Sequence, residues 1–364
     1  MTAPRATSTE VHLPELDLLR ATALLAVVFI HAASWVTGGD APAQQGPYAG
    51  AMALARFSVP AFVLASGLAL RHAYGRPADA GAFLRRRALR TLAPWLAWVP
   101  VYAVMDLIYG KIAPNPHDVV VWLAYGPGHL YFLMLVAQLS LLFPCLPSGR
   151  ARLAGLAAGA LVMQVALGVA RTYAPLPTGP LSWPITNLPQ IEAPFWVGWF
   201  LVGCALAADY ERVRALSWLW PVALLVAVLG GLAVLAEATV VPGDPSRQGT
   251  AAFLWPSRLP AALAVAVLLL WVGRELAPHA HRLWTVVRAL SRRSLGIYVI
   301  HVAVIEALAH TALIGLPPPL RLVVLMGGSL LIPYWLTGVL TRTSAGALAL
   351  GEPGKVRWRP SGAG

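Results

Sequence analysis

An arginine and a histidine stand eleven residues apart in the first apolar segment of the chain, LDLLRATALLAVVFIHAASW (residues 16–35). At about 100° per residue, eleven helical steps bring Arg20 and His31 to within about 20° of one face, about 16 Å apart along the axis. Asp17 lies three residues before Arg20 and shares that face. A guanidinium binds anions, and a neutral imidazole can serve as general base for an alcohol nucleophile. The segment therefore predicts a polar stripe with both functions.

His31 lies within an apolar stretch, where an ionisable group is costly unless it faces a bundle interior or a wet cavity. Two interpretations meet that requirement. His31 either bonds a neighbouring helix or acts as the base of a reaction centre. Its place on the Arg20 stripe favours the second.

A dense basic cluster, FLRRRALRTLAPW, occupies residues 83–95. Arg87 and Arg90 are three residues apart and share a helix face, and Pro94, four residues after Arg90, would free the Arg90 carbonyl and bend the helix. Guanidinium groups match phosphate geometry, so Arg87 and Arg90 are predicted to bind a phosphate-bearing ligand. Arg85 and Arg86 are predicted to anchor the helix at the membrane surface.

Ser294, Tyr298 and His301 in SLGIYVIH follow an i, i+4, i+7 pattern and form a second polar stripe. The stripe either belongs to the site or supplies interhelical hydrogen bonds. Ser66 and Gly67 are small enough to allow close helix approach. Further residues predicted to support the site or contact an acceptor are Ser66, Tyr131 and Glu192.

Composition points to the lipid bilayer as the solvent of this chain. Of 364 residues, 58% are hydrophobic and only 12% are charged, against about 25% charged in soluble domains. The formal net charge is +12, but the arginines cluster between apolar segments, which indicates membrane topology rather than nucleic-acid binding. The two cysteines show no metal-ligand spacing. No metal and no bound cofactor are expected.

The apolar pattern predicts an all-α integral membrane protein with about ten transmembrane helices. The segments are Leu18–Thr37, Ala51–Leu70, Leu92–Ile108, Leu130–Leu146, Leu153–Ala170, Ile191–Ala208, Leu216–Ala236, Leu259–Gly273, Leu295–Ile314 and Leu320–Leu340. They predict one transmembrane domain over residues 1–345 and a short cytoplasmic tail over residues 346–364.

Basic residues are concentrated in alternate loops, which the positive-inside rule places in the cytoplasm together with both termini. An even number of spans is required for that arrangement, and ten satisfies it. We expect a multi-pass protein of the plasma membrane. A cleaved signal peptide, with Ala21–Ile30 as its apolar region, is the alternative for the first segment, but cleavage would discard His31.

These motifs together resemble the membrane-bound acyltransferase family 3. The family's first helix has the form LDxLRaxAxxxVvxxHa, and LDLLRATALLAVVFIHA matches it, including the spacing of Arg20 and His31. The other matching phrases, in order, are AFVLASGLAL with Ser66 and Gly67, Arg87 and Arg90 followed by Pro94, YFL at Tyr131, and SLGIYVIH. The second phrase departs from the family at Ala61 and Ala65, where an aromatic and a leucine are common.

The resemblance implies transfer of an acyl group, often acetyl, from acyl-CoA as co-substrate to a hydroxyl of a sugar, glycolipid or secondary metabolite. On this reading His31 activates the hydroxyl, and Arg87, Arg90 and Arg20 hold the phosphates of the donor. Whether His31 acts only as a base or transiently carries the acyl group stays open. Some family members have an additional SGNH-hydrolase-type domain, and this chain is expected to act without one or with a separate partner.

Two other classes of protein compete with this interpretation. In a transporter, buried ionisable groups would form a substrate or proton path, but the sequence has no inverted repeat and no matched pair of broken helices. A structural membrane subunit would need no polar stripes. Release of thiol from acetyl-CoA distinguishes an acyltransferase from both. The oligomeric state is not predicted.

Overall fold

The computed structural model describes residues 12–38, 46–111, 126, 128–173, 193–240, 255–311 and 315–352. Within these ranges the chain is helical and contains no β-strand. Seven helical segments there are long and apolar enough to span a membrane. They are α1 (Pro14–Val36), the consecutive pair α3 (Ala49–Ala55) and α4 (Ser58–Tyr74), α5 (Ala80–Ile108), α8 (Arg150–Tyr173), α12 (Leu219–Val240), α13 (Arg258–Leu276) and α16 (Pro318–Leu340).

Three shorter apolar helices coincide with the remaining predicted segments. They are α7 (Tyr131–Leu142), which continues into η1 (Phe143–Cys145), α10 (Val197–Ala208), which follows η2 (Ala193–Phe195), and α15 (Ser294–Ala309). Each has 10–17 residues, fewer than the ~20 that a helix needs to cross a bilayer alone. The all-helical, multi-pass character is confirmed, whereas the count of ten spans stays a prediction.

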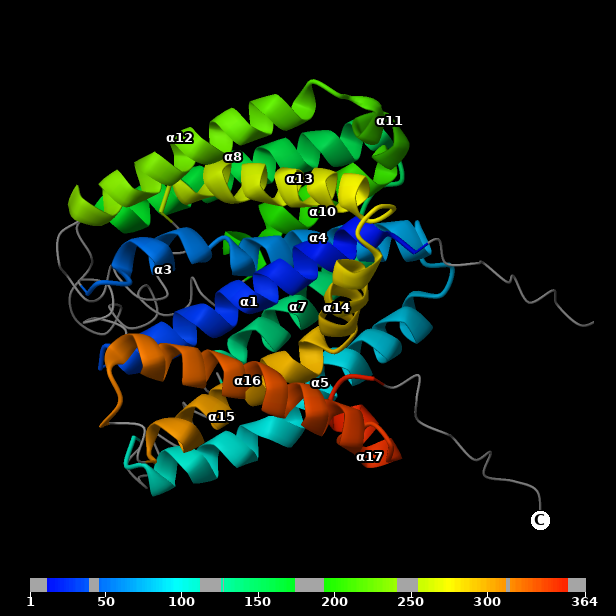
Figure 1. Ribbon diagram of the computed structural model, residues 1–364. Coiled ribbons are helices and arrows are strands. Elements are labelled where there is room, and N and C mark those ends of the chain that lie inside the picture. The colour runs from blue at the N-terminus through cyan, green and yellow to red at the C-terminus, as the bar shows by residue number, and fades with distance from the viewer. Residues whose placement is uncertain are drawn as a thin grey trace, which may run out of the picture.

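Helix α1 lies at the centre of the bundle, in contact with α3, α4, α13, α14 (His281–Arg292), α15 and α16 (Figure 1). The most apolar stretches of α1 and of Ala49–Tyr74 are 61% and 67% buried, against 17–28% for the other five long helices. The outer helices are therefore the ones with apolar faces left for lipid. The polar residues of α1 face other helices, as an ionisable stripe requires.

Helices α4 and α10 pack with their backbones almost touching. A Cβ atom on Gly67 would lie 2.1 Å from the carbonyl oxygen of Phe200, and one on Gly203 would lie 2.1 Å from that of Leu64. Any side chain at either position would force the helices apart. The prediction that the Ser66-Gly67 pair permits close helix approach is confirmed.

Helix α5 contains Pro94, so the carbonyl of Arg90 loses its helical N–H partner. Gly351 packs against this carbonyl, because a Cβ atom added to Gly351 would lie only 2.6 Å from the Arg90 carbonyl oxygen. Gly351 also has φ +69°, a conformation that favours glycine. The indole nitrogen of Trp98 donates to the carbonyl of Ala349 at 3.0 Å. Residues 344–352, including helix α17 (Ser344–Ala349), therefore pack back onto α5, so the first part of the predicted tail belongs to the fold.

Two short helices, α11 (Tyr210–Ala215) and α14 (His281–Arg292), lie at the end of the bundle where α1 begins and where α17 lies (Figure 1). The apolar pattern leaves residues 274–294 only as a basic connection between two predicted spans, whereas the structure forms a helix over most of it. Trp284, Val287 and Ser291 are buried at i, i+3, i+7 spacing, which is one face of an amphipathic helix. That face packs on α1 and carries its C-terminal residues toward the first turn of α1.

Candidate active site

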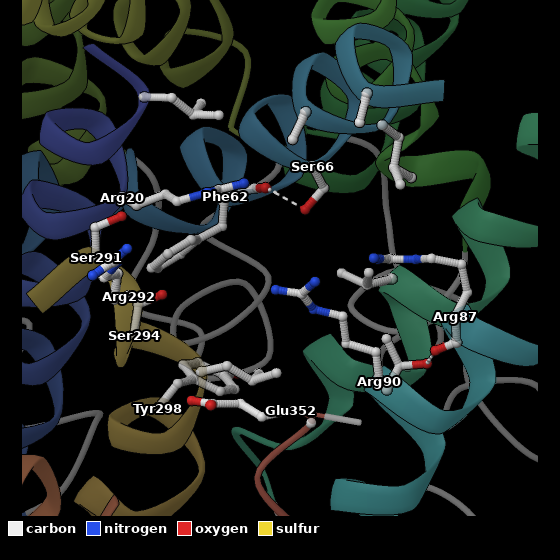
Figure 2. A pocket seen from close by; sticks show the side chains of 18 of the residues that line it. Arg20, Phe62, Ser66, Arg87, Arg90, Ser291, Arg292, Ser294, Tyr298 and Glu352 are labelled. Atoms are coloured by element: carbon white, nitrogen blue, oxygen red, sulfur yellow. Dashed lines mark hydrogen bonds between the residues drawn. The ribbon is translucent and has the colours of Figure 1, made fainter. Parts of the chain in front are cut away.

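A cavity of about 600 Å³ lies between the N-terminal halves of α1 and α5 (Figure 2). Its volume is within the range typical of sites for small molecules and cofactors. Its walls come from α1, α4, α5, α7, α14, α15 and residues 350–352. Its polar and charged lining residues are His12, Asp17, Arg20, Ser66, His72, Tyr74, Arg87, Arg90, Thr91, Ser291, Arg292, Ser294, Tyr298 and Glu352.

Four arginines line this space, which we call the arginine cavity: Arg20, Arg87, Arg90 and Arg292. Figure 2 shows the Arg90 side chain reaching from α5 into the open space between Ser66 and Tyr298. The charges of Arg20 and Arg87 both lie close enough to that of Arg90 to repel it. Like charges held this close are unfavourable unless an anion lies between them. The arrangement therefore suits a ligand with several negative charges.

Arg87 is held in place by helix α7. Its Nε donates to the hydroxyl of Ser140 at 3.2 Å, and that hydroxyl donates to the carbonyl of Val136 at 2.7 Å. The backbone carbonyl of Arg87 accepts from the hydroxyl of Thr91 at 2.9 Å. A guanidinium has five N–H donors, so this single anchoring bond leaves terminal N–H groups for a ligand.

Asp17 lies at the edge of the cavity and ties α1 to α14. Its Oδ1 accepts from the hydroxyl of Ser291 at 2.7 Å, and its Oδ2 lies 2.9 Å from Nε2 of His12 and 3.9 Å from Nε of Arg288. The carboxylate is buried, and these partners share its charge. Asp17 thus positions the two helices that carry Arg20 and Arg292.

The stripe on α15 leads from the cavity into the protein. Ser294 and Tyr298 line the cavity, whereas His301, one further turn along, is fully buried. The hydroxyl of Tyr298 donates to the backbone carbonyl of His129. Ser66 lines the opposite wall, and its hydroxyl donates to the carbonyl of Phe62 at 2.8 Å (Figure 2).

Three imidazole rings meet at the inner end of this stripe, and we call them the histidine cluster. The ring centroid of His31 lies 5.2 Å from that of His301 and 6.1 Å from that of His129. The centroids of His129 and His301 are 5.4 Å apart. His129 and His301 are buried and His31 is half-buried. The two predicted stripes, on α1 and on α15, therefore converge at His31 and His301.

Two predicted residues are not part of this arrangement. Tyr131 is buried in the main hydrophobic core and does not line the cavity. Glu192 lies outside the described residues. Sequence reasoning missed Arg292 and His129. The helical spacing of Trp284, Val287 and Ser291 is the signal that would have found Arg292.

Comparison with known proteins gives one result, and it concerns the family. No curated protein and no solved structure matches the chain. A family model described as an acyltransferase domain, Acyl_transf_3, matches residues 13–338, nearly the whole chain, and spans α1 to α16 with almost all of the arginine cavity and all of the histidine cluster. The chain therefore belongs to the acyltransferase 3 family and is a membrane O-acyltransferase.

Proposed function

We propose that the protein transfers an acyl group, acetyl in the first instance, from acyl-CoA to a hydroxyl of a sugar, glycolipid or secondary metabolite. The observation that carries this proposal is the continuity along α15. Tyr298 lines the arginine cavity and also contacts His129 and His301. A donor bound by the arginines would therefore have its acyl end directed toward His31.

The arginine cavity is the proposed donor site. Coenzyme A carries a pyrophosphate and a ribose phosphate, and guanidinium groups bind such phosphates through paired, charge-assisted hydrogen bonds. Arg20, Arg87 and Arg90 supply these groups, as the motifs predict, and Arg292 adds a fourth. The two carboxylates of the lining, Asp17 and Glu352, leave an excess of positive charge for the donor.

His31 is the proposed general base. Its unprotonated ring nitrogen takes the proton of the acceptor hydroxyl as that oxygen attacks the thioester carbonyl. The new C–O bond forms, the C–S bond breaks, and the electron pair leaves with the sulfur. The proton on His31 then passes to the sulfur and gives free coenzyme A thiol. These reaction steps need no metal and no bound cofactor.

The topology is proposed from the charge pattern. Ten spans with basic loops in the cytoplasm of a plasma-membrane protein would put the arginine cavity on the cytoplasmic side, where acyl-CoA is made. The described first turn of α1 and helix α17 lie at the same end of the bundle (Figure 1), which suits an even number of crossings. We assign residues 1–345 to the transmembrane domain and the remainder to a cytoplasmic extension of it.

Thiol release from acetyl-CoA by the detergent-purified protein tests this function. We expect saturable binding of acetyl-CoA by calorimetry and thiol release that increases when hydroxyl compounds, such as alkyl glycosides, are added. A transporter would release no thiol. Absence of acetyl-CoA binding in well-folded protein would refute the donor assignment.

A further inference from the structure

A hydrogen bond fixes the tautomer of one ring in the histidine cluster. Nδ1 of His301 lies 2.6 Å from the carbonyl oxygen of Tyr298. Since a carbonyl oxygen only accepts, Nδ1 carries the proton and Nε2 of the neutral ring is a bare lone pair. The ring of His129 lies against those of Tyr102 and Tyr298, and its Nε2 is also buried without a partner.

Both Nε2 atoms are buried without a hydrogen-bond partner. The tyrosines that touch these rings do not supply one, because the hydroxyl of Tyr102 donates to the Val299 carbonyl at 2.9 Å and that of Tyr298 donates to the His129 carbonyl. Buried acceptors without donors are rare in proteins and need a reason. The third ring in contact with both is that of His31.

We propose that His129 and His301 are positioning residues that stabilise the protonated form of His31, because their two Nε2 lone pairs share the N–H of His31 that does not face the acceptor. This inference rests on the proposed function, in which His31 takes the acceptor proton. The imidazolium formed then has two N–H groups, one for the acceptor oxygen and one for the two adjacent Nε2 atoms. The pair does the work that a carboxylate does in serine hydrolase triads.

A neutral partner has a different consequence from a carboxylate. A carboxylate beside His31 would favour the protonated form of His31 more strongly than the Nε2 lone pair of a neutral imidazole does. The proton can therefore be accepted from the hydroxyl and afterwards released to the sulfur of the leaving thiol.

Paired substitutions at His301 and His129 test the proposal through the hydrogen bond itself. Glutamine places Oε1 near the position of Nε2 and still accepts, whereas leucine has similar size and accepts nothing. The assay is steady-state thiol release from acetyl-CoA, with n-octyl β-D-glucopyranoside as hydroxyl probe. We expect His301→Leu and His129→Leu to lower kcat about ten- to a hundredfold, the weight of a hydrogen bond to a charged group, with the KM for acetyl-CoA unchanged. His301→Gln and His129→Gln should retain most of the activity.

His310→Leu is the matched control. His310 lies just after α15, its Nδ1 also bonds a backbone carbonyl, that of Glu306, and its ring contacts Tyr109 and Trp35 instead of the cluster. Its replacement should leave kcat unchanged. Equal losses in the glutamine and leucine variants would mean that His129 and His301 only fill space, and full activity in the leucine variants would mean that they do nothing. Either result overturns the proposal while leaving the proposed function intact.

The tautomers are measurable without turnover. Nitrogen-15 spectra of histidine-labelled protein should show Nδ1 protonated and Nε2 unprotonated at His129 and His301, with assignments made from the glutamine variants. A protonated Nε2 at either ring overturns the proposal. Absence of thiol release by the wild-type protein would instead count against the proposed function, and the spectra would still decide the inference.

Discussion

The arginine cavity and the histidine cluster lie at the two ends of one polar stripe on α15, but they differ in packing and charge. Arg90 and Arg292 are exposed at the cavity, whereas His129 and His301 are only 5% and 0% exposed. The cavity concentrates fixed positive charge, whereas the cluster consists of three imidazole rings, two of them buried. A ligand that must enter and leave needs water access, whereas proton transfer is favoured where water is excluded.

The proposed function therefore assigns donor binding and proton transfer to separate groups of residues. Tyr298 is the residue that lines the cavity and also contacts the cluster. Variants at the cavity should therefore change the affinity for acyl-CoA, and variants at the cluster should change turnover. A variant that changed both the affinity for acyl-CoA and the turnover would contradict this separation of roles.

The largest expected effect is that of His31→Ala. Loss of a general base typically costs about 10²- to 10⁴-fold in rate, so thiol release should fall to near background, while calorimetry should give an unchanged Kd for acetyl-CoA. His279→Ala, an exposed histidine between α13 and α14, is the control. Normal turnover by His31→Ala would remove the base from the proposed mechanism.

The next largest effect is expected on donor affinity. Each charge-assisted hydrogen bond contributes about 1.5–3 kcal/mol, so Arg87→Ala/Arg90→Ala should raise the Kd for acetyl-CoA at least about a hundredfold. Turnover at saturating acetyl-CoA should change far less. The matched control, Arg85→Ala/Arg86→Ala, removes two exposed arginines of the same helix that do not line the cavity. Equal effects of the two pairs of substitutions on the Kd would mean that Arg87 and Arg90 only anchor the helix at the membrane surface.

Arg292→Ala tests whether the cavity arginine that no motif predicted contributes to acetyl-CoA binding. Loss of one of four guanidinium groups should weaken acetyl-CoA binding about tenfold, and the effect should shrink as salt screens the exposed charges. Arg282→Ala lies on the same helix, is exposed and does not line the cavity. If both variants bind acetyl-CoA as the wild type does, no side chain of α14 contributes to donor binding.

Gly351→Ala should give the smallest effect. The new Cβ would lie 2.6 Å from the Arg90 carbonyl oxygen at a backbone φ of +69°, a strain of about 1–3 kcal/mol. We expect a Tm lowered by a few degrees and a severalfold loss of acetyl-CoA affinity, because Arg90 moves with its backbone. Gly149→Ala, where nothing lies within 4 Å, controls for the loss of a glycine. An unchanged Kd would show that Arg90 tolerates this movement.

The sequence predicted the parts of this arrangement that depend on local spacing. The eleven-residue interval between Arg20 and His31, the i, i+4, i+7 stripe of α15 and the effect of Pro94 all follow from helix geometry. The structure places Arg20, Ser294 and Tyr298 at one cavity, and His31 and His301 at one cluster. Such features are readable because a helix fixes side-chain direction without tertiary contacts.

The missed residues depend on contacts between distant parts of the chain. His129 precedes α7, outside any periodic pattern, and its partners Val299 and Tyr298 lie about 170 residues further on, on α15. The arginines of α14 made its sequence look like a basic loop, so the amphipathic pattern of its buried residues was not recognised. The contact of Gly351 with the Arg90 carbonyl leaves no pattern in either segment.

The position of Gly351 also sets an order of events during synthesis. Helix α5, with Arg87 and Arg90, enters the membrane early, but Leu350, Gly351 and Glu352 complete the cavity wall only after α16 has been made. A nascent chain that has reached α15 contains His31, His129 and His301 but lacks residues 350–352 of the cavity wall. The proposed donor site is therefore complete only when synthesis has passed residue 352, after every residue of the histidine cluster is already in the chain.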